Sequence, residues 1–339
     1  MVEVLKRLTE ARGVSGNENE VREIVIELAS ETGAEVSVDR MGNVIARKPG
    51  KEGAKKVMLA AHMDEVGFII SSISENGMLK FQTIGSIDQR LLLSKRVLIG
   101  KNAVPGVIGV KAIHLQLPDE RNQVVKQKQM FIDIGASSKE EAQKVVQLGD
   151  YASFDSSFVQ FGDNKVKAKA LDDRVGCSVL LEILKEDYDF EFIACFTTQE
   201  EVGLRGATVA AYHLDPDMAV VLEGTTCADI PDVPEHMMTT RMGRGPAISF
   251  MDNSSIANPK LFKQMVETAE AHGIPYQIKE NIAGGNDAGT IQTARSGVAT
   301  VVVSTPCRYI HSPSSMLDLE DYYNAVRLVK EFLKGCESH

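Results

Sequence analysis

The sequence contains no tryptophan, and aromatic residues make up only 6% of its 339 positions. It therefore offers few flat side chains for stacking against sugar rings or nucleic-acid bases. Its five cysteines are an odd number, and none of them is part of a Cys-x-x-Cys pair. A disulfide scaffold and a structural zinc knuckle are both disfavoured by this pattern.

The chain also lacks long apolar runs and an excess of positive charge. No stretch approaches the roughly 20 apolar residues of a membrane-spanning helix, and the first residues, MVEVLKRLTEARG, lack the apolar centre of a secretory signal. The net charge is −10, with lysine and arginine scattered along the sequence. We therefore expect a cytoplasmic protein that binds neither nucleic acid nor a membrane.

The length of the chain is sufficient for two domains. Residues 1–67 and 166–339 contain apolar runs typical of buried strands, which alternate with segments of helical periodicity. Residues 68–165 instead alternate short β-rich runs with turns, which is typical of a small barrel or sandwich. We expect an α/β catalytic domain of residues 1–67 and 166–339, with a mixed, mostly parallel sheet and helices on both faces. Residues 68–165 would form an inserted β-rich domain.

Side chains that bind metals well follow several of the apolar strands of the predicted α/β domain. They are His62 after the run 57–61, Glu200 and Glu201 after 190–196, Glu223 after 217–222, and His311 beyond 298–304, with Asp172 just ahead of a predicted helix. The carboxyl ends of parallel strands share one edge of a sheet. We therefore expect these side chains to converge on one site.

Two histidines combined with carboxylates suit Zn²⁺ or Co²⁺ better than Mg²⁺ or Ca²⁺. The set also fits two ions better than one, because one carboxylate can bridge while each ion receives a histidine and a further carboxylate. Asp64 follows His62 by two residues and could orient its ring. One member of the pair Glu200 and Glu201 then remains as a general base for a water molecule. Either glutamate could take that role.

Five segments occur in the order AHMDEVG, ALDDRVG, TTQEEVG, VLEGTT and RYIHS. Together they resemble the M42 family of metallo-aminopeptidases, in the clan of zinc-dependent exopeptidases. The resemblance covers essentially the whole chain, and it identifies the insert with a PDZ-like dimerisation domain. It implies hydrolysis of N-terminal residues from peptides, with a water that bridges two divalent ions, Zn²⁺ or Co²⁺, as the nucleophile. It also implies homodimers that build a homododecamer.

The resemblance gives each candidate residue a role. The bridging ligand would be Asp172; one ion would also be held by His62 and Glu223, and the other by Glu201 and His311. The general base would be Glu200, and Asp64 would orient His62. Many relatives have aspartate at the position of Glu223, so we expect the longer side chain to alter the affinity of that ion. The loop GGNDAG resembles the family's GGTDAG, with Asn286 in place of threonine.

Two other classes of function are open to a chain of this kind. Paired carboxylates also define glycosidases, and some similar sequences are called endoglucanases. Glycosidases need no metal-binding histidines, however, and this chain is poor in aromatic residues. A non-catalytic, metal-bearing assembly protein would leave Glu200 without a reason to stand beside Glu201. The residues do not indicate whether the preferred N-terminal residue is acidic, basic or apolar.

Overall fold

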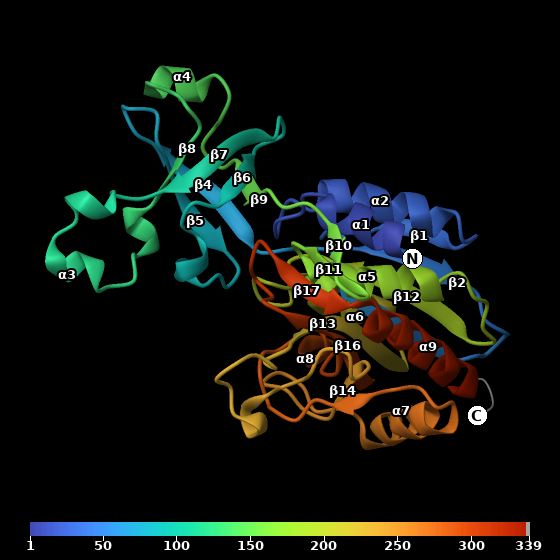
Figure 1. The fold of residues 1–339 in the computed structure, drawn as a ribbon. Helices are drawn as coiled ribbons and strands as arrows, with labels where there is room; N and C mark the ends of the chain where they lie inside the picture. The colour runs from blue at the N-terminus through green and yellow to red at the C-terminus, as the bar shows by residue number, and fades with distance from the viewer. Residues whose placement is uncertain (337–339) are drawn as a thin grey trace.

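A computed structural model describes residues 1–336, in which a sheet-centred body carries a separate barrel (Figure 1). The body contains an eleven-stranded mixed sheet whose main path is β1-β2-β12-β3-β13-β16-β17-β11-β10, while β14 pairs with β16 and β15 pairs with β14. The strands are β1 (Glu35–Val38), β2 (Val44–Lys48), β3 (Lys56–His62), β10 (Val159–Phe161), β11 (Lys165–Ala168), β12 (Glu191–Thr197), β13 (Met218–Thr226), β14 (Ala247–Ser249), β15 (Gln277–Ile278), β16 (Ala299–Arg308) and β17 (Ser315–Asp318).

The centre of this sheet is parallel and its flanks are antiparallel. Strands β12, β3, β13 and β16 run side by side in one direction, with Thr197 opposite His62 and Ser304 opposite Glu223. The central strands are buried on both faces, which explains their nearly continuous apolar sequence. The predicted fold class is confirmed, and the predicted site residues share one edge of the sheet.

Helices cover both faces of the sheet. The larger core packs α1 (Val2–Glu10), α2 (Asn19–Ser30), α5 (Leu171–Ile183), α7 (Pro259–Ala271) and α9 (Leu319–Cys336) against one face, and the smaller core packs α6 (Arg205–Leu214) and α8 (Ala288–Ile291) against the other. Glu18 occupies the N-cap position of α2. Within residues 1–336, no helix is both long and apolar enough to cross a membrane.

The barrel is closed and entirely antiparallel, in the order β4-β5-β8-β7-β6-β9. Its strands are β4 (Gly67–Ile73), β5 (Leu79–Ile84), β6 (Arg96–Ile99), β7 (Val104–Gly109), β8 (Phe131–Asp133) and β9 (Tyr151–Phe154), with the short helices α3 (Pro118–Arg121) and α4 (Lys139–Gln143) beside them. Phe68 packs edge-on against Phe81 and Phe154 in its core, at ring separations of 5.2 and 5.1 Å. The insert limits 68–165 stay a prediction.

Candidate metal centre and active site

Six side chains from five parts of the chain line one cavity of about 210 Å³. They are His62 at the end of β3, Asp172 at the start of α5, Glu200 and Glu201 in the turn between β12 and α6, Glu223 in β13, and His311 in the turn between β16 and β17. The structure therefore brings together all six candidate ligands and bases predicted from the sequence. Glu223 lies within β13 rather than after it, because the strand continues to Thr226.

The carboxylate of Asp172 lies between the two histidines. Its Oδ1 is 3.2 Å from Nε2 of His62, and its Oδ2 is 3.3 Å from Nε2 of His311. On one side, Glu223 Oε2 lies 3.8 Å from the same nitrogen of His62. On the other side, Glu201 Oε1 lies 3.2 Å from Nε2 of His311. Each oxygen of Asp172 thus faces a different histidine.

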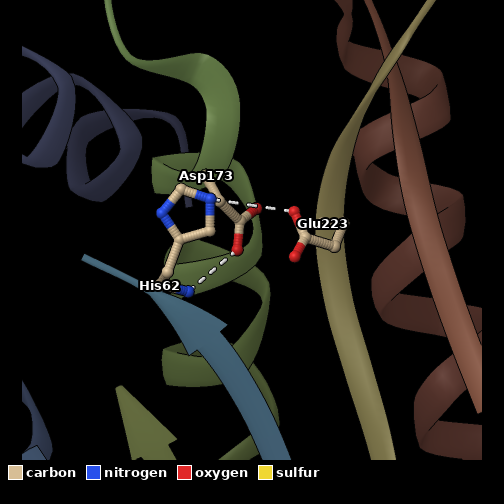
Figure 2. Close-up of side chains that lie close together, drawn as sticks. All are labelled: His62, Asp173 and Glu223. Atoms are coloured by element: carbon tan, nitrogen blue, oxygen red, sulfur yellow. Dashed lines mark hydrogen bonds and ion pairs between the residues drawn. The ribbon is translucent and has the colours of Figure 1, made fainter. Parts of the chain in front are cut away.

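Asp173 is a site residue that the sequence analysis missed. A carboxylate oxygen of Asp173, a ring nitrogen of His62 and a carboxylate oxygen of Glu223 all lie within 4.8 Å of one another. The ligand atoms of Asp172, Glu201 and His311 form a second cluster of that size. The carboxylate of Asp173 accepts the backbone N–H of His62 at 3.1 Å (Figure 2) and that of Gly176 at 3.0 Å. The doubled aspartate in ALDDRVG was the available signal, but a helix start explains paired acids equally well.

Asp64 lies directly beneath the two glutamates and is fully buried. Its Oδ1 accepts the backbone N–H of Glu200 at 2.9 Å, and its Oδ2 accepts that of Glu201 at 3.1 Å. The hydroxyl of Ser15 donates to Oδ2 at 2.6 Å. Nδ1 of His62 lies 3.1 Å from the backbone oxygen of Asp64 and 3.4 Å from its carboxylate. The carboxylate therefore contacts the glutamate turn more closely than it contacts the histidine.

Two glycines permit the close approach of backbone to these acids. A Cβ on Gly224 of β13 would lie 3.0 Å from the Cα of Asp172. A Cβ on Gly176 of α5 would lie 2.4 Å from Oδ1 of Asp173. Real Cβ atoms are not found at the second distance, so the carboxylate of Asp173 fits only against glycine there.

The protonation of the site reflects five carboxylates held close together in a buried place, those of Asp172, Asp173, Glu200, Glu201 and Glu223. Burial, together with the charges of nearby acids, raises the pKa of Glu200 to about 9, against the opposing effect of His62. Burial disfavours the charged form of His311, but hydrogen bonds to Asp172 and Glu201 raise its pKa to about 11. Burial also raises the pKa of Glu223 well above its usual range. Carboxylates so placed need compensating cations if all are to be ionised.

The donor set fits divalent metal ions. Two imidazoles and several carboxylate oxygens are the usual ligands of Zn²⁺ and related ions. Oε1 of Glu223 is buried and has no hydrogen-bond partner among the described residues. A buried carboxylate oxygen in that condition is costly unless something positive meets it.

The loop that contains Gly284 and Gly285 forms another wall of the cavity, together with Lys279. Asn286 donates its side-chain N–H to Oδ2 of Asp252 at 2.8 Å and so fixes this loop. Asp287 accepts the hydroxyl of Thr197 at 2.6 Å. The sequence analysis did not identify Lys279 or Asp252, because neither lies in a motif or at the end of a long apolar strand.

The chain is similar to known proteins over nearly its whole length. A family model described as M42 glutamyl aminopeptidase matches residues 42–328. An aminopeptidase structure from Desulfurococcus kamchatkensis has a TM-score of 0.95 and 40% identity, over 100% of this chain and 94% of that one. The lysyl aminopeptidase of Pyrococcus furiosus is 32% identical over 340 residues, which is 98% of this chain and 96% of that protein. The TET1 peptidase of Pyrococcus horikoshii, described as assembling into a tetrahedron or a large octahedral shell, has a TM-score of 0.87 and 35% identity over 98% of each chain.

Proposed function

The chain belongs to the M42 peptidase family and is an aminopeptidase, and on that premise we propose how its site residues divide the work. We propose that Asp172 bridges two divalent ions, Zn²⁺ or Co²⁺. His62 and Glu223 would complete one set of ligands, and Glu201 and His311 the other. The observation that carries this proposal is the position of Asp172, whose two oxygens each face a different histidine.

Asp173 is the competing ligand on the side of His62. Both of its carboxylate oxygens already accept backbone N–H groups, from His62 and from Gly176. We therefore assign Asp173 to positioning the backbone of His62, and we keep Asp172 as the ligand. A residue that orients a metal-binding histidine commonly matters nearly as much as the ligand itself.

Bound ions of this kind would supply Lewis acidity, which polarises the peptide carbonyl and lowers the pKa of water at the site. Glu200 would take the proton from the attacking water and deliver it to the leaving amine. Its side chain lies at the cavity and 3.9 Å from Nε2 of His62, close to the proposed ions without being needed as a ligand. Asp64 would hold Glu200 and Glu201 in place through their backbone N–H groups.

The glycosidase alternative is not favoured. The matching family model and the lysyl aminopeptidase relative are both described as aminopeptidases. The acids of the site also lie in two clusters with His62 and His311 that could each hold a metal ion. The non-catalytic alternative is disfavoured by the same family membership.

We further propose that the chain forms homodimers which build a homododecamer in the cytoplasm. The P. horikoshii relative is described as forming closed shells, which supports a large assembly here. The barrel stands apart from the body and would be accessible to a second copy (Figure 1). All five cysteines are unbridged, in keeping with a reducing compartment. Light scattering coupled to size exclusion would measure the particle mass.

The experiment that tests the proposed site is metal removal and reconstitution. Protein stripped with a chelator should release no amine from aminoacyl chromogenic amides. Zn²⁺ or Co²⁺ should restore the activity as elemental analysis rises to two ions per chain. Saturation at one ion per chain would contradict the bridged arrangement. Activity that survives complete metal removal would contradict the metal mechanism altogether. Reducing sugar released from a glucan would favour the glycosidase alternative.

A further inference from the structure

Lys279 is the only lysine or arginine among the described residues that line the site cavity. It follows β15 directly, and its backbone N–H donates to the carbonyl of Ile248 at 3.0 Å. The residue is only 6% exposed. Lysine is almost never buried to this extent unless its charge is paired.

The ammonium of Lys279 has few partners for a buried charge. Nζ donates to the carbonyl oxygen of Ala283 at 3.1 Å, and in residues 1–336 it forms no ion pair with a carboxylate. Asp252 exerts the largest attraction on it, followed by Glu223 and Asp172. Both oxygens of the Asp252 carboxylate, however, are already occupied by Ser254, Ser255 and Asn286. An ammonium has three N–H donors. Two donors of Lys279 are therefore left for something that enters the cavity.

The rest of the cavity wall divides by charge. The acids and histidines of the proposed metal centre occupy one part of the lining, and uncharged Thr225, Thr226 and Asn286 are also among the lining residues. The cationic α-amino group of a peptide would be attracted to the acids. Its first side chain would then extend into the remaining space of the cavity, where Lys279 is the one lysine or arginine among the described lining residues.

We propose that Lys279 determines the specificity of the site and selects peptides whose N-terminal residue carries a side-chain carboxylate. The inference rests on the proposed aminopeptidase site. An acidic side chain can pair with the ammonium and use its free donors. A basic side chain would be repelled, and an apolar one would cover those donors without satisfying them. Glutamine can offer an oxygen but no charge.

A matched pair of substrates tests the charge directly. The metal-loaded enzyme should hydrolyse an N-terminal glutamyl amide with a kcat/KM that exceeds that of the glutaminyl amide by roughly 10- to 100-fold, the range expected for a hydrogen bond to a charged group. The two substrates have the same shape. Equal rates on them, or a preference for leucyl or lysyl amides, would overturn the inference.

Substitution then assigns the preference to this residue. Lys279→Met should lower kcat/KM for the glutamyl amide to that of the glutaminyl amide, and should raise it for the leucyl amide, because an apolar side chain then no longer covers unsatisfied donors. Lys263→Met is a matched control, because Lys263 is exposed on α7 and pairs with Glu267 on the same helix. An equal loss on all substrates would show that Lys279 merely anchors Ala283, and would overturn the assignment. If Lys279→Met fails to fold, Lys279→Arg replaces it, and should keep the acidic preference while shifting KM.

These measurements distinguish a failure of the proposal for Lys279 from a failure of the proposed aminopeptidase mechanism. If the metal-loaded protein hydrolyses no aminoacyl amide of any kind, the proposed site mechanism fails. If it hydrolyses neutral or basic amides better than acidic ones, only the role of Lys279 fails.

Discussion

The carboxylate of Asp64 accepts the backbone N–H of Glu200 at 2.9 Å, and so connects the end of β3 to the turn after β12. Its other oxygen accepts the N–H of Glu201. One buried acid therefore fixes the backbone of both the proposed base and a proposed ligand. The same carboxylate receives the hydroxyl of Ser15 from the segment after α1. The N-terminal part of the chain thereby reaches the site without contacting the cavity.

Replacing Ser15 with alanine should loosen this support. The variant removes a 2.6 Å hydrogen bond to a buried carboxylate, a change that typically costs about 1–3 kcal/mol. We expect kcat to fall several-fold and metal binding to weaken, because Ser15 donates to Oδ2 of Asp64, the oxygen that also holds the backbone N–H of the proposed ligand Glu201. Steady-state kinetics and elemental analysis measure the two effects. Ser30→Ala is the control, since Ser30 is exposed at the end of α2. An unchanged kcat would mean that Asp64 needs no help from Ser15.

Changing Glu200 to glutamine should separate metal binding from catalysis. Glutamine keeps the size of the side chain but cannot accept the proton of water, so we expect kcat to fall by roughly 10²–10⁴-fold. Both ions should remain bound, because Glu200 is not a proposed ligand. His311→Ala is the contrasting variant and should reduce metal occupancy. Loss of an ion together with a mild loss of rate in the Glu200 variant would exchange the roles of Glu200 and Glu201.

The parallel centre of the fold could be predicted because strands that are buried on both faces have nearly continuous apolar sequences. The runs 57–61 and 190–196 are almost wholly apolar, and each is followed by a polar site residue. Such strands are short, and their carboxyl ends must meet at one edge. The convergence of His62 with Glu200 and Glu201 follows from that rule alone.

The parts that could not be predicted depend on contacts between distant backbone groups. Strand β17 is only four residues long and includes a serine and an aspartate, so no apolar pattern in the sequence predicts it. Asp173 accepts the backbone N–H of His62, a residue 111 positions away. Lys279 follows a strand of two residues, β15. In each case the hydrogen-bond partner is a backbone group of another segment, and the pattern of side chains in the sequence does not predict such a contact.

Alanine at Gly176 should destabilise the protein, although it usually favours a helix. In an unconstrained helix the change from glycine to alanine is worth up to about 1 kcal/mol. In α5 the new Cβ would meet both oxygens of Asp173, at 2.4 and 2.5 Å, and would displace the carboxylate that holds the N–H of His62. We expect a lower midpoint of thermal unfolding and weaker metal binding. Gly335→Ala, near the end of α9, should be neutral or slightly stabilising. Equal behaviour of the two variants would contradict the packing argument.

The stability of the protein should vary with pH through Asp321. This side chain in α9 is 1% exposed and accepts the N–H groups of Gly243 and Gly245, each at 2.6 Å. Burial raises its pKa to about 6, whereas an unfolded aspartate has a pKa of about 3.9. Between these values the folded state binds more protons than the unfolded state. The contribution of Asp321 to stability is therefore greatest at low pH and declines as the pH rises from about 4 to about 6.

Asp321→Asn should remove this dependence, because asparagine does not titrate. Its amide can accept one of the two glycine N–H groups but not both, so the variant should be less stable at every pH. The difference in unfolding free energy between the two proteins should shrink by at most about 2–3 kcal/mol as the pH rises from about 4 to about 6, following the shift in pKa. Urea unfolding at several pH values across this window measures the difference. A difference that stays constant would mean that Asp321 is ionised throughout the window in the folded protein, with the two glycine N–H groups compensating for its burial.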